Sequence, residues 1–134
     1  MNALIRWALI VAIGLLTAEA AWAAAPELDI LSPREGGTIH PDPKLGAVVV
    51  TEFEVKHFKI VDFTGVTIQE PGVGHILIRL DNQPFSTIHT ESKISVFGQV
   101  TPGKHTVTLE LVNNDHTPLK PRVIKTVHFT VASH

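Results

Sequence analysis

Residues 102–118, PGKHTVTLELVNNDHTP, decide the fold of this 134-residue chain. A Pro-Gly pair opens the stretch, residues 104–112 alternate polar and apolar side chains, and an Asn-Asn-Asp-His-Thr-Pro sequence closes it. Alternation with a period of two is typical of a β-strand with one buried face, and the closing residues are ones that form turns. The stretch therefore predicts a complete strand with a turn at each end.

Similar extended segments recur along the rest of the chain. The expected strands are residues 28–33, 47–58, 75–80, 85–89, 93–97, 104–112 and 122–131, with 59–63 continuing or restarting the second. A long glycine-containing loop is expected at 64–74 and a connection at 113–121. No segment shows a sustained helical period, and about seven short strands at even spacing are typical of a sandwich. We predict an all-β fold, an immunoglobulin-like antiparallel β-sandwich of about seven strands.

The alternation also predicts which faces are buried. The expected core positions are Val49, Thr51, Phe53 and Val55, then Ile76, Ile78 and Leu80, then Val127, Phe129 and Val131. Charged residues occupy the opposite face of the 47–58 segment, so that face is expected to be solvated.

Residues 1–23 have the pattern of a cleavable signal peptide. Arg6 is an early cation, residues 7–16 are apolar, and residues 21–23 fit an A-x-A cleavage site. Thr17 and Glu19 interrupt the apolar run well short of the roughly 20 residues that span a bilayer. The mature domain is therefore expected to be residues 24–134, periplasmic or secreted, with no membrane insertion after cleavage.

Composition narrows the possible partners and activities. The formal charge is −2, with no cluster of Lys or Arg, which argues against nucleic acid and anionic lipid as partners. The absence of cysteine excludes a disulfide framework and thiol chemistry. The chain contains no Gly-x-Ser-x-Gly elbow, no phosphate-binding glycine loop and no His-Glu-x-x-His motif. We therefore do not expect an enzyme.

Histidine is the most unusual feature of the composition, because all eight histidines lie beyond residue 23. Imidazole is the commonest metal ligand near neutral pH. The best candidate ligands are His75, His105, Asp115 and His116, because a sandwich brings strand ends together. The chain has no cysteine, and Met1 is its single methionine, so Cu(II) or Zn(II) is the expected ion rather than Cu(I).

Each candidate ligand also has a structural interpretation. His105 shares parity with Val107, so it is expected to point inward at the edge of the core as a packed, hydrogen-bonded residue. Asp115 and His116 lie in a turn that hydrogen bonds from side chain to backbone can build. His128 lies on the polar face and is expected to be solvated. We favour the structural interpretation for His105 and for the turn, and no cofactor is assigned with certainty.

Three parts of the chain carry a family resemblance: Leu31-Ser32-Pro33 with Gly36-Gly37, Gly74-His75-Ile76 with Leu80-Asp81, and the 102–106 and 113–118 ends of the opening stretch. They resemble a group of exported bacterial immunoglobulin-like domains of unassigned function. The resemblance covers essentially all of the chain after residue 23 and implies the sandwich fold. Members often carry His-x-His in the strand that here starts at His75, which would place both imidazoles on one face. This chain has Leu77 at the second position, so that ligand pair is not carried over.

Two functions follow as expectations. The first is an exported, non-catalytic binding or accessory module of the cell envelope, which contacts a protein or envelope partner through a sheet edge or the loops at one end. The alternative is a periplasmic protein that binds Cu(II) or Zn(II) through clustered His and Asp side chains. The sequence leaves the partner and the oligomeric state open.

Overall fold

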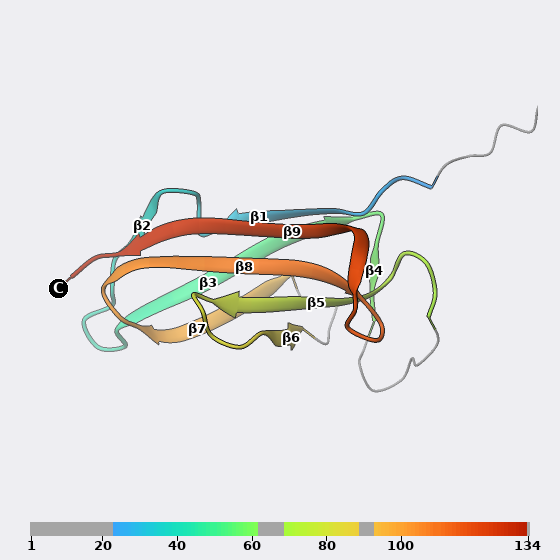
Figure 1. The fold of residues 1–134 in the computed structure, drawn as a ribbon. Helices are drawn as coiled ribbons and strands as arrows, with labels where there is room; N and C mark the ends of the chain where they lie inside the picture. The colour runs from blue at the N-terminus through green and yellow to red at the C-terminus, as the bar shows by residue number, and fades with distance from the viewer. Residues whose placement is uncertain (1–22, 62–68, 89–92, 134) are drawn as a thin grey trace, which may run out of the picture.

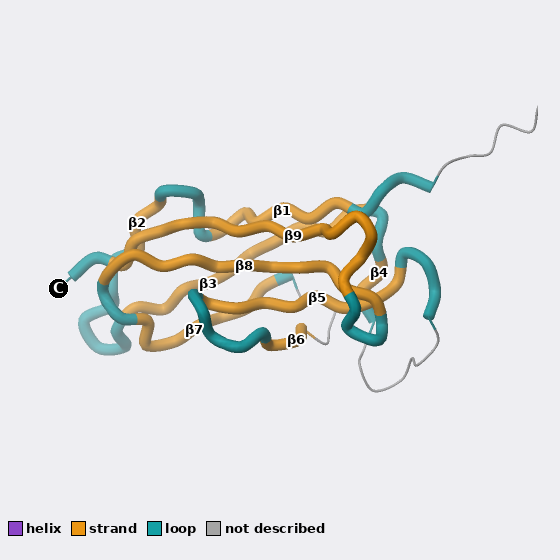
Figure 2. The backbone as a smooth tube through the Cα atoms, viewed as in Figure 1, coloured by secondary structure: helices purple, strands orange, loops and turns teal. Residues whose placement is uncertain are grey.

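The computed structural model describes residues 23–61, 69–88 and 93–133. These residues form two β-sheets packed face to face, and none of them is helical (Figures 1 and 2). The strands are β1 (Glu27–Ser32), β2 (Gly37–Ile39), β3 (Ala47–Lys56), β4 (Lys59–Ile60), β5 (Val73–Leu80), β6 (Ser86–Ile88), β7 (Ile94–Val100), β8 (Gly103–Asn113) and β9 (Pro118–Val131). In this part of the chain, no helix is available to span a bilayer. The predicted fold class, an immunoglobulin-like β-sandwich, is confirmed.

The two sheets differ in size and pairing. The smaller sheet has the antiparallel order β1-β3-β7. The larger has the order β2-β9-β8-β5-β4, and β6 also pairs with β5. β2 runs parallel to β9, and β4 runs parallel to β5, whereas the other pairs are antiparallel. The long strands β8 and β9 therefore form the centre of the larger sheet, next to β5.

The core fills the space between the inner faces of the sheets. Strand register places Ile76 opposite Leu111 and Ile78 opposite Leu109, so these side chains share the inner face of the larger sheet. Phe53 faces them from β3 and is 1% exposed. The buried core comprises Leu28, Ala47, Val49, Phe53, Ile76, Ile78, Leu80, Val100, Val107, Leu109, Leu111, Phe129 and Val131. The predicted inner faces of β3 and β5 are thus the observed ones.

Some predicted boundaries were wrong. The last strand begins at Pro118 rather than residue 122, because β9 pairs with β8 on both sides of a bulge. Val112 pairs with Pro118 and Leu111 with Val123, so Pro121 lies in the bulge, where no ladder hydrogen bond is required of it. The predicted 64–74 loop is also too long, because β5 already begins at Val73.

Several predictions fall outside the described residues. They are residues 1–22 of the predicted 1–23 signal peptide, residues 62–63 at the end of the predicted strand, and residues 64–68 of the predicted loop. His89, the last residue of the predicted 85–89 strand, and the connection at 90–92 also lie outside.

The outer face of β8 is buried, which the alternation did not predict. Glu110 on this face is 3% exposed. Arg122 on β9 donates from Nε to Glu110 Oε1 at 2.7 Å and from Nη2 to Oε2 at 2.8 Å. A carboxylate can be buried when a bidentate guanidinium pairs with it. The side chain of Arg122, from the neighbouring strand β9, therefore lies against Glu110 on the outer side of β8.

Candidate functional site

Two of the four predicted ligand residues meet where β8 ends. Gly74 pairs with Asn113, so His75 on β5 lies beside the turn that carries His116. The centroids of the two imidazole rings are 5.0 Å apart, with an angle of 49° between the ring planes. His75 is 1% exposed. Its Nδ1 lies 3.0 Å from the carbonyl oxygen of Val61, and because a carbonyl only accepts, Nδ1 is the donor.

Asp115 stabilises the turn beside this pair. Its Oδ1 accepts hydrogen bonds from the Thr117 backbone nitrogen at 3.0 Å and from the Thr117 hydroxyl at 2.6 Å. These bonds hold the pKa of Asp115 below its ordinary value. His116 occupies the left-handed position of the turn at φ 63°, and its backbone nitrogen donates to the Asn113 carbonyl oxygen at 2.9 Å. The structural interpretation of the turn agrees with this geometry.

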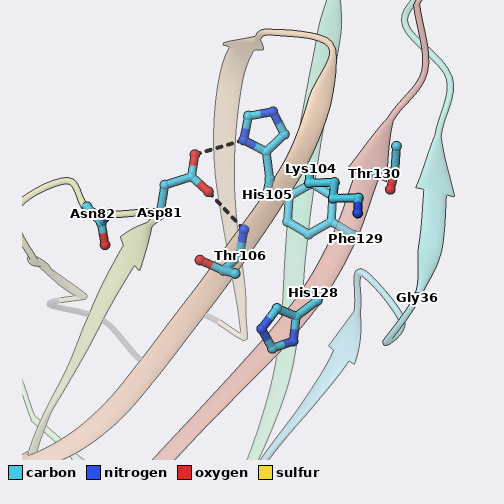
Figure 3. Close-up of a pocket in the computed structure, with 9 residues that line it drawn as sticks. All are labelled: Gly36, Asp81, Asn82, Lys104, His105, Thr106, His128, Phe129 and Thr130. Carbon is cyan, nitrogen blue, oxygen red and sulfur yellow. Dashed lines mark hydrogen bonds and ion pairs between the residues drawn. The ribbon is translucent and has the colours of Figure 1, made fainter.

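His105 lies near the opposite end of β8, away from the other predicted ligands. Its Nδ1 is 2.7 Å from Asp81 Oδ2, and its Nε2 is 2.7 Å from the Thr101 carbonyl oxygen (Figure 3 shows the first contact). Both partners are acceptors, so both ring nitrogens must donate, and this is possible only for an imidazolium. The ring also lies against Phe129, with a centroid distance of 5.8 Å. With both nitrogens engaged, His105 has no lone pair for a metal.

The surroundings of His105 act on its pKa in opposite directions. Burial of the ring lowers the pKa, but the hydrogen bond and charge of Asp81 and the carbonyl of Thr101 raise it more, so the pKa lies above its ordinary value. Asp81 is itself fixed, because its Oδ1 accepts from the Thr106 backbone nitrogen at 2.8 Å. Asp81 follows β5 in the larger sheet, and Thr101 follows β7 in the smaller one. The His105 imidazolium therefore links the two sheets through its hydrogen bonds to Asp81 and Thr101.

A surface hollow of about 570 Å³ lies beside this ion pair. Its lining residues, drawn in Figure 3, are Gly36, Asp81, Asn82, Lys104, His105, Thr106, His128, Phe129 and Thr130. His128 is 66% exposed, as predicted for a solvated residue, and its Nδ1 lies 3.1 Å from Glu35 Oε1. Two side chains of the hollow are therefore paired with carboxylates of this chain, His105 with Asp81 and His128 with Glu35.

The predicted four-residue metal cluster is not assembled as a unit. The structure brings His75 and His116 together, places Asp115 in the same turn, and separates His105 from them. Across residues 23–61, 69–88 and 93–133, no group of three or more His, Asp or Glu side chains is arranged to hold a metal ion.

Sequence reasoning missed the exposed apolar surface of the smaller sheet. We call it the outer strip, and it consists of Val48, Val50, Ile94 and Val96, which are 38%, 42%, 51% and 59% exposed. Val50 pairs with Val96, so the side chains of β3 and β7 lie next to one another on the face away from the core. The signal was present in residues 47–50, Ala-Val-Val-Val, where alternation gives way to a continuous apolar run.

Comparisons with known proteins show the fold alone. The chain is similar to a solved structure of fibronectin(III)-like modules of Clostridium thermocellum CbhA, with 13% identity, a TM-score of 0.53, and coverage of 78% of this chain and 94% of that one. It is also similar to an engineered protein, with 11% identity and a TM-score of 0.52 over 83% of this chain and 21% of that one. An endo-beta-1,4-mannanase from Thermotoga petrophila matches at 14% identity and a TM-score of 0.48, over 88% of this chain and 22% of that one. No protein-family model matches the chain, and no curated protein sequence matches it.

Proposed function

We propose that this protein is an exported, non-catalytic binding module of the cell envelope, which contacts a protein or envelope partner through the outer strip. The observation that carries the proposal is the position of Val48, Val50, Ile94 and Val96, four exposed apolar side chains gathered on one sheet face. The largest contiguous apolar patch on the surface of a soluble domain is often functional.

The energetic argument is the area that a partner would remove from water. Fully burying a Val or Ile side chain is worth about 1.5–3 kcal/mol. The outer strip exposes about half of each side chain, so a partner covering all four would gain on the order of 4 kcal/mol before the costs of association. This gain is comparable to the low end of the cost of association, about 4 kcal/mol, so a partner must add contacts of its own beyond the outer strip. Immunoglobulin-like sandwiches present such faces on a rigid scaffold, and the fibronectin(III)-like modules of CbhA share that scaffold.

Site-specific photocrosslinking tests the proposal. A photoreactive amino acid at Val50 is compared with the same group at Ile124, which is 41% exposed on the larger sheet and serves as the matched control. We expect an adduct from position 50 that is absent from position 124, in cells that express the full-length gene. Equal adducts from both positions, or none from position 50, would contradict the proposal. Cell fractionation and the mass of the mature N-terminus test export and cleavage after Ala23 in the same preparation.

A second candidate function is the binding of Zn(II) or Cu(II), which the His75 and His116 geometry favours. A tetrahedral ion with metal-to-nitrogen bonds of about 2.0 Å would hold two imidazole centroids about 5 Å apart. The observed separation is 5.0 Å. The hydrogen bond from His75 Nδ1 to the Val61 carbonyl is the kind of support that orients metal-bound histidines. Water would have to complete the coordination shell.

Isothermal titration with Zn(II) and Cu(II) tests this candidate. His116→Asn removes one imidazole and keeps a side chain that tolerates the left-handed φ of 63°. His128→Asn, at an exposed histidine elsewhere, is the control. We expect stoichiometric binding that His116→Asn weakens at least about tenfold, as loss of one ligand should, and that His128→Asn leaves unchanged. Equal metal affinities for the two variants would rule out metal binding by His75 and His116.

A further inference from the structure

We propose that the hollow at the ends of β8 and β9 binds an oxyanion, the group that phosphates and carboxylates share. The hollow has a volume of about 570 Å³, within the range of about 300–1,000 Å³ that is usual for small-molecule sites. It lies on the larger sheet, whereas the outer strip belongs to the smaller one. The inference therefore goes beyond the proposed function and does not depend on it.

The topology of the larger sheet builds this hollow. The sheet order places β9 and β8 between β2 and β5. The turn that contains Gly36 precedes β2, and Asp81 and Asn82 follow β5. All three residues line the hollow, together with residues at the ends of β8 and β9 (Figure 3). The hollow therefore has a floor of two paired strands and a turn on each side.

Four side chains of β8 and β9 line the floor as two cross-strand pairs. Lys104 pairs with Thr130, and Thr106 pairs with His128, and strand alternation places all four on the same face. The backbone nitrogens of Thr106 and His128 donate to side chains outside this strand pair. The two pairs are therefore the non-hydrogen-bonded ones of the ladder, in which side chains lie closest. An ammonium group, two hydroxyls and an imidazole are thus held next to one another.

The carboxylates beside the floor already accept hydrogen bonds from this chain. Asp81 accepts from the Thr106 backbone nitrogen at 2.8 Å and from His105 at 2.7 Å, with one bond to each oxygen. Glu35 accepts from the His128 backbone nitrogen at 2.9 Å, and its other oxygen lies 3.1 Å from His128 Nδ1. Both oxygens of each carboxylate are therefore engaged by groups other than the ammonium of the floor.

Lys104 supplies the positive charge that an anion would meet. The ion pairs formed among residues 23–61, 69–88 and 93–133 do not include Lys104. Because the neighbouring carboxylates are engaged and this ammonium is not, the charge left for a ligand is positive. Lysine is a common partner of phosphate groups. The hydroxyls of Thr106 and Thr130 can rotate to donate to the same ligand.

The exposure of Lys104 limits the affinity. An exposed ion pair contributes little, because water and salt screen it. Inorganic phosphate should therefore bind with a dissociation constant on the order of 1–10 mM. A larger molecule that carries the same group would gain further contacts with Asn82, which also lines the hollow.

An NMR titration of the nitrogen-15-labelled protein, expressed from the full-length gene, tests the inference. Inorganic phosphate and acetate are added in separate series, and sodium chloride keeps the ionic strength constant. We expect saturable shifts of the amide signals of Lys104, Thr106 and Thr130. Lys104→Gln removes the ammonium group and should weaken binding about three- to tenfold. Lys120→Gln is the matched control, because Lys120 is an exposed lysine near the other end of β9.

The two series also distinguish the sources of the anion. Saturation by phosphate alone assigns the hollow to phosphate groups, saturation by acetate alone assigns it to carboxylates, and saturation by both assigns it to either. Each of these results supports the inference. Absence of saturable shifts in both series up to about 100 mM would overturn it, since that concentration exceeds the expected dissociation constant at least tenfold.

The two lysine variants decide whether the hollow is the site. Equal affinities of Lys104→Gln and Lys120→Gln would overturn the inference, because binding would then not depend on the ammonium group in the hollow. Circular dichroism of each variant establishes that it is folded. The photocrosslink from Val50 reports on the outer strip of the smaller sheet, so it tests the proposed function independently of either result.

Discussion

Raising the pH should weaken the link that His105 makes between the two sheets. His105 donates from both ring nitrogens, to Asp81 and to the Thr101 carbonyl, each at 2.7 Å. A neutral imidazole has one N–H, so deprotonation must break one of the two hydrogen bonds. The pKa of His105 is raised in the folded protein. Its contribution to stability is therefore fully present below the unfolded pKa of about 6.5 and is lost as the pH rises through the folded pKa.

The size of the effect follows from the bond that is lost. A hydrogen bond to a charged partner contributes about 1.5–3 kcal/mol. The side chain of His105 is 10% exposed, but that of Asp81 is 37% exposed, so water weakens the interaction. We take the lower end, about 1.5 kcal/mol. At about 4 °C per kcal/mol for a domain of this size, the melting temperature should fall by about 6 °C above the folded pKa.

Thermal unfolding followed by circular dichroism between about pH 6 and pH 9 measures this fall, since the interval begins near the ordinary pKa of histidine. His105→Gln should unfold at a lower temperature at pH 6 and should lack most of the pH dependence. His128→Gln is the control, because the His128 and Glu35 side chains are 66% and 63% exposed. It should retain the pH dependence of the unaltered protein.

The reasoning is refuted if the unaltered protein and His105→Gln show the same fall in melting temperature over this range. Nitrogen-15 NMR provides an independent check. Both ring nitrogens of His105 should carry protons at about pH 6, below the ordinary pKa of histidine, and Asp81→Asn should lower the pKa of the ring.

Three further predictions concern the scaffold and the turn. Gly74→Ala should lower the free energy of unfolding by about 3 kcal/mol or more, because an added Cβ would overlap the Val112 carbonyl oxygen. Gly98→Ala is the control, because an added Cβ there has open space and should leave the free energy of unfolding nearly unchanged. Urea titrations measure both values. Phe53→Ala should lower the free energy of unfolding by about 3–5 kcal/mol in the same measurement, because it leaves a cavity at a 1% exposed position between the sheets. Val48→Ala, at a 38% exposed position of the same strand, should lower it far less. Thr117→Val removes the hydroxyl that donates to Asp115, so the pKa of Asp115 should rise toward its ordinary value in a carbon-13 NMR titration. An unchanged pKa would show that the hydrogen bond from the Thr117 backbone nitrogen is sufficient to keep it low.

The inner faces of the strands could be predicted from the sequence because a strand repeats every two residues. Val49, Thr51 and Phe53 were assigned to the core by parity alone, and all three are buried. The same rule failed on the outer side of β8. Glu110 is a charged residue at a position that parity assigns to solvent, but it is 3% exposed, and Arg122, twelve residues further along the sequence, pairs with it. Local alternation contains no information about cover from neighbouring strands.

The candidate sites depended on register, which a single sequence does not contain. His75 and His116 meet because Gly74 pairs with Asn113, and a shift of one residue would turn His75 to the other face. Asp81 reaches His105 because Leu80 pairs with Val107, and nothing in the order of residues indicates this partner. The outer strip was not predicted for a different reason. Val48 and Val50 share a face with Glu52 and Glu54, and the charges led us to expect that the whole face was solvated.

The parallel pairing of β2 with β9 has a mechanical consequence. The described chain enters at one end of the sandwich and leaves at the other, so tension between its ends would pull these two strands in opposite directions along their length (Figure 1). The bonds that flank the pair, from the Gly36 nitrogen to the His128 carbonyl at 2.7 Å and from the Ala132 nitrogen to the Ile39 carbonyl at 2.9 Å, would be loaded together in shear. Antiparallel strands pulled from a shared end open one bond at a time. This short patch should therefore be the point at which the domain resists stretching.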